Sequence, residues 1–117
     1  MMLFIEYPKC TTCIKAKIFL QAKRVEFICR NIKEDNPTIK ELKKWHQESG
    51  LPLKKLFNTS GLLYKELNLK DKLDKMSDEE KYELLASNGM LVKRPILVTD
   101  KGVTFGFKEE VWIELMK

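Results

Sequence analysis

Two cysteines separated by two residues lie where an apolar segment gives way to a helical one. The motif Cys10-Thr11-Thr12-Cys13 follows the apolar run 2–5 and precedes a stretch of helix-forming residues. This order places Cys10 at the point where a strand ends and a helix begins. The first N–H groups of a helix have no intrahelical partner and carry partial positive charge, which stabilises a thiolate. The sequence therefore predicts a reactive Cys10, with Cys13 about one helical turn away and within reach of a disulfide.

The segments on both sides of the motif follow a strand–helix–strand pattern. We expect a strand over 2–7, a helix over 11–24 and a second strand over 25–30. Because a helix of about a dozen residues joins them, the two strands should be parallel, with a right-handed crossover. A Cys-x-x-Cys motif at the start of such a crossover helix is typical of a thioredoxin-like redox site.

The middle of the chain, about 37–89, carries helix and loop signals only. Asn36 and Pro37 suit the N-cap and the first position of a helix that Gly50 ends. A capping box begins a later helix at Ser77. We expect this helix to span 77–89 and a short helix to span 61–67. Residues 53–60 and 70–75 should be connections.

The last part of the chain returns to strands and ends in a helix. Residues 94–99 and 103–107 read as strands joined by a turn at 100–102, and a terminal helix follows from Glu109. The order is therefore β-α-β, a helical block, then β-β-α. We expect one domain over 1–117, an α/β fold with a four-stranded mixed sheet and a helical insertion between its two halves.

The composition indicates a globular protein in a reducing compartment. Hydrophobic residues make up 44% and charged residues 33% of the 117-residue chain. The N-terminal apolar run is too short for a membrane span and lacks the layout of a signal peptide, so we expect a cytoplasmic protein without membrane contact. There a cysteine pair is more often catalytic, sensing or metal-binding than structural. The net charge of +5 fits a solvated surface. The sequence has no basic run with interleaved aromatic residues, so we do not expect direct nucleic-acid binding.

Four motifs in order resemble the arsenate reductase (ArsC)/Spx family. They are Cys10-Thr11-Thr12-Cys13, Phe57-Asn58-Thr59-Ser60-Gly61, Lys93-Arg94-Pro95-Ile96-Leu97-Val98 and Gly106-Phe107-Lys108-Glu109-Glu110. The resemblance covers nearly the whole chain. It implies a thioredoxin-like fold with a helical insertion, and a thiol-disulfide oxidoreductase in which Cys10 is the nucleophile and Cys13 the resolving thiol.

Two kinds of protein in this family imply two different functions. Its glutaredoxin-linked arsenate reductases hold the oxyanion with three arginines, of which only Arg94 has a counterpart here. The loop after Pro52 carries Lys54 and Lys55 instead, so we predict weak arsenate reduction. Spx-type regulators use Cys-x-x-Cys as a redox switch and bind the C-terminal domain of the RNA polymerase α-subunit. The alternative to an enzyme is therefore a redox-sensing transcriptional regulator with that partner.

The resemblance also implies roles for the residues around Cys10. Arg94 would stabilise an anion or the thiolate, although a structural cation is the alternative. Thr11 and Thr12 would contribute to substrate binding, or would simply begin the helix. Pro95 would lie at the substrate site, behind a cis Arg94–Pro95 bond. An external glutaredoxin or thioredoxin would reset the thiols, and no metal or organic cofactor is implied.

Two other interpretations of the cysteine pair remain. Cys10 and Cys13 could be neighbouring core residues, or they could bind zinc. A zinc site needs about four ligands, and the other candidates, Cys29 and His46, belong to separate predicted elements. Cys29 alternates with Val25 and Phe27, which predicts a buried structural thiol. His46 lies at the edge of a helical apolar stripe and is expected to be partly packed.

Overall fold

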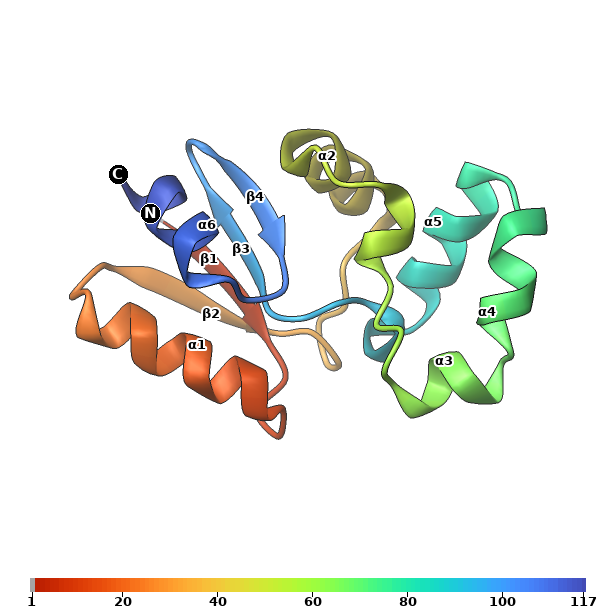
Figure 1. Cartoon of the computed structure of the whole chain (residues 1–117), viewed down its shortest axis with the longest axis horizontal. Helices are drawn as coiled ribbons and strands as arrows, with labels where there is room; N and C mark the ends of the chain where they lie inside the picture. Colours follow the sequence, from red (N-terminus) through yellow and green to blue (C-terminus); the bar gives the residue numbers. More distant parts are fainter. Residues whose placement is uncertain (1) are drawn as a thin grey trace.

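The computed structural model describes residues 2–117 and is organised around a four-stranded mixed sheet (Figure 1). The strands are β1 (Met2–Glu6), β2 (Phe27–Asn31), β3 (Ile96–Thr99) and β4 (Gly102–Phe105), in the spatial order β2-β1-β3-β4. β1 runs parallel to β2, whereas the β1–β3 and β3–β4 pairs are antiparallel. The predicted α/β class, the parallel crossover and the C-terminal hairpin are confirmed.

Two helices cover one face of the sheet. They are α1 (Thr11–Ala22), which connects β1 to β2, and α6 (Glu109–Met116), which follows β4. Phe4 of β1 and Leu97 of β3 are register partners, and both are fully buried on this face together with Trp112 of α6. This face therefore holds a small core of its own, in which α1 is fixed with its N-terminus at the end of β1.

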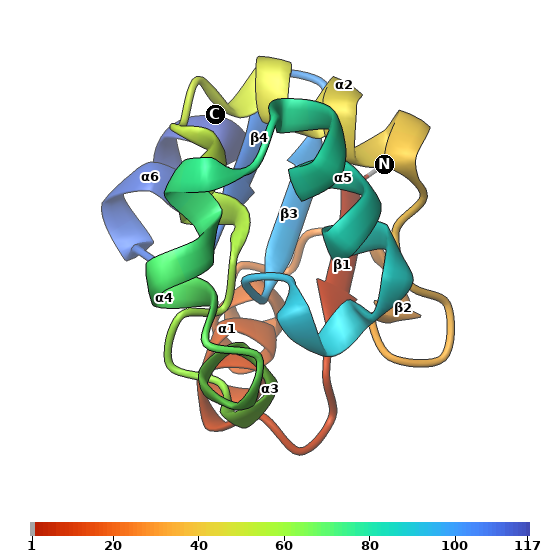
Figure 2. The same cartoon turned by 90° about the vertical axis from the view of Figure 1, so that its right-hand side faces the viewer.

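A helical insertion between β2 and β3 covers the other face and extends beyond one end of the sheet (Figures 1 and 2). Its first helix, α2 (Ile39–Ser49), packs against β4. The remaining elements are short: η1 (Leu53–Leu56), α3 (Leu62–Glu66), α4 (Leu69–Lys72), η2 (Leu73–Lys75), α5 (Asp78–Ser87) and η3 (Gly89–Leu91). The predicted helical insertion is confirmed.

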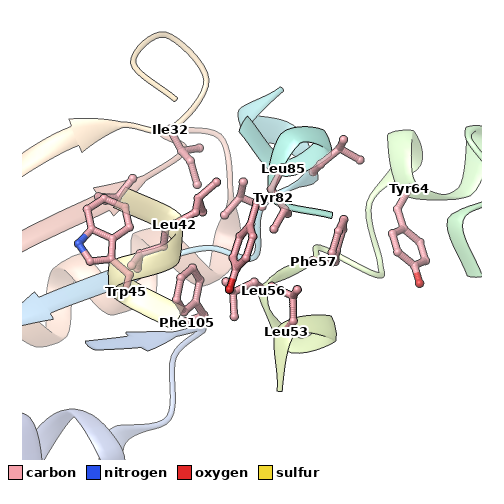
Figure 3. Close-up of a cluster of buried hydrophobic side chains, with 14 of the residues drawn as sticks. Ile32, Leu42, Trp45, Leu53, Leu56, Phe57, Tyr64, Tyr82, Leu85 and Phe105 are labelled. Carbon is pink, nitrogen blue, oxygen red and sulfur yellow. The ribbon is translucent and has the colours of Figure 1, made fainter. Parts of the chain in front are cut away.

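A second hydrophobic core joins this insertion to the sheet (Figure 3). Ile5 and Ile96 point into it from β1 and β3, opposite to Phe4 and Leu97, because successive strand residues face opposite sides. Trp45 from α2 lies in the same cluster. The insertion thus continues the core of the sheet and holds the loops after α2 in place.

Several predicted boundaries need correction. α1 ends at Ala22, and not at 24, because Arg24 adopts a left-handed φ of 57° that a helix cannot contain. α2 begins after Thr38, and not after Asn36. Asn36 is engaged elsewhere, since its Nδ2 donates to the carbonyl oxygen of Ala86 over 2.5 Å. Thr38 instead forms a capping box with Glu41.

Of two predicted side-chain environments, one is wrong and one is correct, and one predicted connection is helical. Cys29 is exposed, and the expectation of a buried structural thiol was wrong. Cys29 lies in β2, which is at the edge of the sheet. No strand lies beyond β2 to cover the outer side of this thiol. His46 is half-buried as expected, with Nδ1 2.6 Å from the Tyr82 hydroxyl. Residues 70–75, expected to be a connection, lie in α4 and η2.

No helix in the described part of the chain is long and apolar enough to cross a membrane.

Candidate functional site

Cys10 occupies the N-cap position of α1. Its backbone is extended (φ −86°, ψ 121°), while its carbonyl oxygen already accepts the first helical hydrogen bond, from the N–H of Ile14 over 3.0 Å. Its own N–H donates to the carbonyl oxygen of Tyr7 over 2.9 Å, which closes the turn that leaves β1. The half-buried thiol therefore lies beside the free N–H groups of the first helical turn.

The two cysteines of the motif have opposite acidities. Partial burial alone would raise the pKa of Cys10, but hydrogen bonds from the backbone N–H and the thiol of Cys13 and from Arg94 lower it below the ordinary value. Burial raises the pKa of Cys13 to about 12, and its hydrogen bond to the Cys10 sulfur holds its proton in place. Cys13 is fully buried. The pair therefore consists of one accessible, acidic thiol and one buried, protonated thiol.

Arg94 supplies the cation at this site. Its guanidinium is near enough to Cys10 to lower the pKa of that thiol, and its central carbon lies 5.2 Å from the centre of the Tyr7 ring. Its Nε and Nη1 atoms are buried and have no hydrogen-bond partner within residues 2–117. Buried donors without a partner are costly, so these two N–H groups suit an anionic acceptor beside the Cys10 sulfur. The Arg94–Pro95 bond is cis, as expected.

A groove of about 830 Å³ opens at the Cys10 sulfur. The part of its lining near Cys10 comes from four separate regions of the chain: Thr12, Lys55, Asn58, Ser60, Gly61, Lys93, Arg94 and Phe107. The loop 58–61 after η1 thus faces the start of α1, and the segment before β3 lies at the same end. Lysines and amide or hydroxyl groups surround the thiol, which makes this end of the groove suited to an anionic or polar substrate.

The predicted site residues are partly brought together. Cys10, Thr12 and Arg94 line the groove, and Cys13 lies directly beneath Cys10. Thr11 is exposed and Pro95 is buried, and neither lines the groove. For these two residues a binding role can come only from the backbone.

Tyr7 is a contact that the sequence prediction missed. Its ring packs under the Arg94 guanidinium and limits where that side chain can lie. The position of Tyr7 in the sequence could have indicated this contact. Tyr7 directly follows β1, and β1 pairs with β3, which Arg94 precedes. Lys54, which was noted for its charge, does not line the groove, whereas Lys55 does.

Cys29 lies apart from this site. Partial burial and a hydrogen bond to Glu6 raise the pKa of its thiol, and Cys29 does not line the groove. Among residues 2–117, no three His, Cys, Asp or Glu side chains gather in a way that could hold a metal ion.

The helix that starts at the Cys-x-x-Cys motif and the cis Arg94–Pro95 bond were both expected from the family resemblance. A comparison with protein families supports the same assignment. Residues 5–115 match the model of the ArsC family. The chain belongs to the ArsC family. The fold of this ArsC-family chain is the predicted thioredoxin-like α/β fold with a helical insertion.

Three relatives of this ArsC-family chain bear on its function. It is 52% identical to the uncharacterised protein YusI of Bacillus subtilis, over 95% of this chain and 94% of that one. It is 33% identical to the regulatory protein MgsR of the same species, over 97% and 89%. It is 30% identical to the global transcriptional regulator Spx of Staphylococcus epidermidis, over 88% and 77%. The relatives to which this chain is similar therefore include named regulators.

Two solved structures share the whole architecture. A putative ArsC family related protein from Bacteroides fragilis is 54% identical and superposes with a TM-score of 0.95, over 97% of this chain and 96% of that one. A possible arsenate reductase from Streptococcus mutans is 43% identical, with a TM-score of 0.88 over 97% and 98%. The insertion between β2 and β3 is thus part of the fold that these proteins share.

Proposed function

We propose that the protein is a thiol-disulfide oxidoreductase in which Cys10 is the nucleophile and Cys13 the resolving thiol. The observation that carries this proposal is the placement of the two thiols at the start of α1, where Cys10 is half-buried and lines the groove while Cys13 is fully buried. A thiolate is the attacking species, and the lowered pKa of Cys10 increases the fraction of this thiol that is ionised. The raised pKa of Cys13 keeps that thiol protonated and silent until a substrate sulfur is attached to Cys10.

The reaction has two exchange steps. The Cys10 thiolate attacks one sulfur of a substrate disulfide, and the other substrate sulfur leaves as a thiolate and takes up a proton. Cys13 then loses its proton and attacks the Cys10 sulfur. This breaks the mixed disulfide, forms the Cys10–Cys13 disulfide and releases the second substrate thiol. A dithiol of the glutaredoxin or thioredoxin class returns two electrons and two protons to the pair.

Arg94 and the helix start assist the first step. The Arg94 guanidinium stabilises the Cys10 thiolate and the thiolate that leaves. Thr12 lines the groove, and the N–H groups of Thr11 and Thr12 at the first turn of α1 offer donors to an anionic group of the substrate. Pro95 contributes through its backbone, which places Arg94 beside Cys10.

A turnover assay tests this proposal. The reduced protein is mixed with hydroxyethyl disulfide and a glutaredoxin or thioredoxin reducing system. Turnover is the NADPH oxidation above that of the reducing system alone, because the reducing dithiol also reacts with hydroxyethyl disulfide directly. Cys10→Ser should abolish turnover, whereas Cys13→Ser should stop at a mixed disulfide that mass spectrometry detects on Cys10. Cys29→Ser is the matched control and should keep the unmodified rate. A full rate in Cys10→Ser would contradict the proposal.

Arsenate should be a poor substrate. Solved relatives carry the name arsenate reductase, but Arg94 is the one arginine at the Cys10 end of this groove, alongside Lys55 and Lys93. Each bidentate arginine contact that is missing costs about 1.5–3 kcal/mol, or roughly ten- to a hundredfold in rate. We expect arsenite formation with glutaredoxin to be far slower than disulfide reduction under the same conditions. Equal rates would show that the lysines replace the arginines.

A second candidate function is a redox-sensing regulator. The relatives named MgsR and Spx favour it. In that case the C-terminal domain of the RNA polymerase α-subunit should bind the chain in one thiol state and not in the other. A pull-down with the purified α domain in reducing and in oxidising buffer makes the distinction. Binding together with an absence of disulfide turnover would assign the chain to the regulators.

A further inference from the structure

The outer edge of β4 carries unpaired backbone groups. β4 is an edge strand whose one neighbour is β3. The N–H of Gly106 donates to the carbonyl oxygen of Pro95 over 2.8 Å, which fixes the phase of the ladder. Because hydrogen-bonded and non-hydrogen-bonded pairs alternate, Thr104 points its backbone groups at β3, whereas Val103 and Phe105 point theirs away. In the described chain no hydrogen bond outside the ladder reaches these two residues.

This free edge faces the same groove that opens at Cys10. Val103 and Phe105 both line the groove. The strand lies between α6 and α2 (Figure 1), and both helices contribute to the walls. The wall residues are Val111 and Leu115 on one side, and Glu48, Ser49 and Leu51 on the other. The groove thus has a free strand edge as its floor, and each of its two walls carries apolar residues. An extended segment can add to a sheet in a groove of this shape.

The free edge leads to the reactive thiol. Phe105 is the register partner of Ile96, which directly follows Pro95 and Arg94. Arg94 and Cys10 both line the groove, and Arg94 is near enough to lower the pKa of the Cys10 thiol, so the Phe105 end of β4 is the end nearest the thiol. An extended segment rises about 3.3 Å per residue. A segment that pairs with Val103 and Phe105 therefore reaches Cys10 within a few residues.

The charges along the groove indicate what kind of segment fits. Its cations are Lys55, Lys93, Arg94, Lys101 and Lys108. Its one carboxylate, Glu48, lies 3.9 Å from the ammonium of Lys44 outside the groove. None of the four lysines forms a salt bridge within residues 2–117. The groove therefore attracts an acidic segment. It disfavours the same edge of a second copy, because that edge carries the same positive charge.

We propose that an extended, acidic segment of a partner protein binds along β4 by strand addition and presents its disulfide to Cys10. The backbone groups of Val103 and Phe105 would hold the segment, and the lysines would select its charge. The exchange chemistry rests on the function proposed above, in which the segment's disulfide is the oxidant. The docking itself needs no redox step, so the two can be tested separately.

Amide hydrogen exchange on the full-length reduced protein tests the docking. The probe is a peptide with blocked ends, Glu-Thr-Glu-Val-Ser-Val-Glu-Thr, which lacks cysteine. In the free protein the amides of Val103 and Phe105 should exchange rapidly, while that of Thr104 is protected. Saturating peptide should slow exchange at Val103 and Phe105 by tenfold or more and leave Thr104 unchanged. Unchanged exchange at both outward amides would overturn the proposal.

Two control peptides separate strand addition from charge attraction alone. Replacing every Glu of the probe by Lys should abolish binding. Methylating the backbone nitrogens on the edge that faces β4 keeps the charge but removes the hydrogen bonds, and this should also abolish protection. Equal binding by the methylated peptide would contradict strand addition. A concentration-dependent dimer with the same two amides protected would assign the groove to a second copy and overturn the proposal as well.

One charge reversal tests the lysines. Lys101 lies at the far end of the groove from Cys10, and Lys101→Glu should weaken the Kd of the acidic peptide roughly threefold or more. Lys70→Glu changes an exposed lysine of α4 outside the groove and should leave the Kd within twofold. Equal loss in both variants would reject the groove. Turnover of hydroxyethyl disulfide without amide protection overturns docking alone, and protection without turnover overturns the oxidoreductase alone.

Discussion

At the scale of single residues, the two thiols of the motif differ because of where the first turn of α1 places them. Cys10 at the N-cap is half-buried and receives hydrogen bonds from Cys13 and Arg94, so its pKa is lowered. Cys13 lies on the side of the helix that faces the core, and burial raises its pKa to about 12. Three residues of separation thus give the two thiols different exposure and opposite pKa shifts.

The order in which the thiols are alkylated follows from this difference. Iodoacetamide at pH 6.5 reacts with thiolates, so Cys10 should be labelled first. Cys29 is exposed, but partial burial of its thiol and the neighbouring Glu6 raise its pKa. Cys29 should therefore be labelled more slowly than Cys10. Cys13 should be labelled last. Mass spectrometry of peptides quenched over time gives the order, and earlier labelling of Cys29 than of Cys10 would contradict the assignment.

Arg94 should be the side chain on which the reactivity of Cys10 depends. Arg94→Met keeps most of the packing against Tyr7 and removes the hydrogen bond to Cys10. Hydrogen bonds to charged groups contribute about 1.5–3 kcal/mol, so we expect alkylation of Cys10 at pH 6.5 to slow by roughly tenfold or more. At pH 10 the difference should shrink, because the thiol is then ionised in both proteins. Lys93→Met is the control for the loss of a neighbouring charge. An unchanged rate in Arg94→Met would leave Arg94 as a structural cation.

At the scale of elements, one carboxylate ties α2 to β2. Glu41 is the third residue of α2 and completes the capping box with Thr38. It also accepts two hydrogen bonds from Arg30 of β2, at 2.7 and 2.9 Å. The bonds from Arg30, and then from the Thr38 backbone, lower the pKa of Glu41 to about 2 even though burial opposes this. The insertion is thereby joined to the sheet at its first helix.

This contact should make the stability of the fold depend on acid. The Glu41 pKa falls from an ordinary 4.5 to about 2, so its contribution is complete above 4.5 and is lost as the pH falls towards 2. Glu41→Gln should lower the free energy of unfolding at pH 7 by about 1–2 kcal/mol, a value reduced for partial exposure. The difference between variant and unmodified protein should shrink between pH 4.5 and pH 2. Urea titrations measure it, with the exposed Glu83→Gln as control. A pH-independent difference would reject this contribution.

At the scale of the whole molecule, two cores share one sheet. Trp45 lies in the core beneath the insertion and Trp112 in the core beneath α1 and α6. β1 and β3 contribute residues to both, since Phe4 and Leu97 face one core while Ile5 and Ile96 face the other. Loss of either core removes the support of strands on which the other depends. We therefore predict that the chain unfolds as one unit.

Single-tryptophan variants test this prediction. Trp45→Phe leaves Trp112 as the fluorescent reporter, and Trp112→Phe leaves Trp45. For each variant, the urea midpoint from fluorescence should coincide with the midpoint from far-ultraviolet circular dichroism. The stabilities of the two variants will differ, and the comparison is made within each variant. A fluorescence transition of Trp45 well before the loss of sheet signal would show that the insertion unfolds separately.

Local patterns were sufficient for most of the architecture and for the reactive end of the site. Alternation and apolar runs predicted the four strands, and the Cys-x-x-Cys motif predicted the helix that starts at Cys10, because both depend on neighbours in the chain. The capping box at Ser77 was correct for the same reason. Thr38 was missed because the choice of cap depended on Asn36, whose side chain binds Ala86, fifty residues away.

Contacts between distant segments were decided in three dimensions. Cys29 shows the alternation of a buried strand residue, but the sheet order places β2 at an edge and leaves the thiol exposed. The stacking of Tyr7 on Arg94, the loop 58–61 opposite Cys10 and the free edge of β4 also depend on which strands become neighbours. A linear pattern records periodicity and local chemistry, whereas burial and the lining of a groove depend on what packs against each segment. For this reason the motif predicted which thiol lies at the start of α1, and the tertiary structure decided what surrounds it.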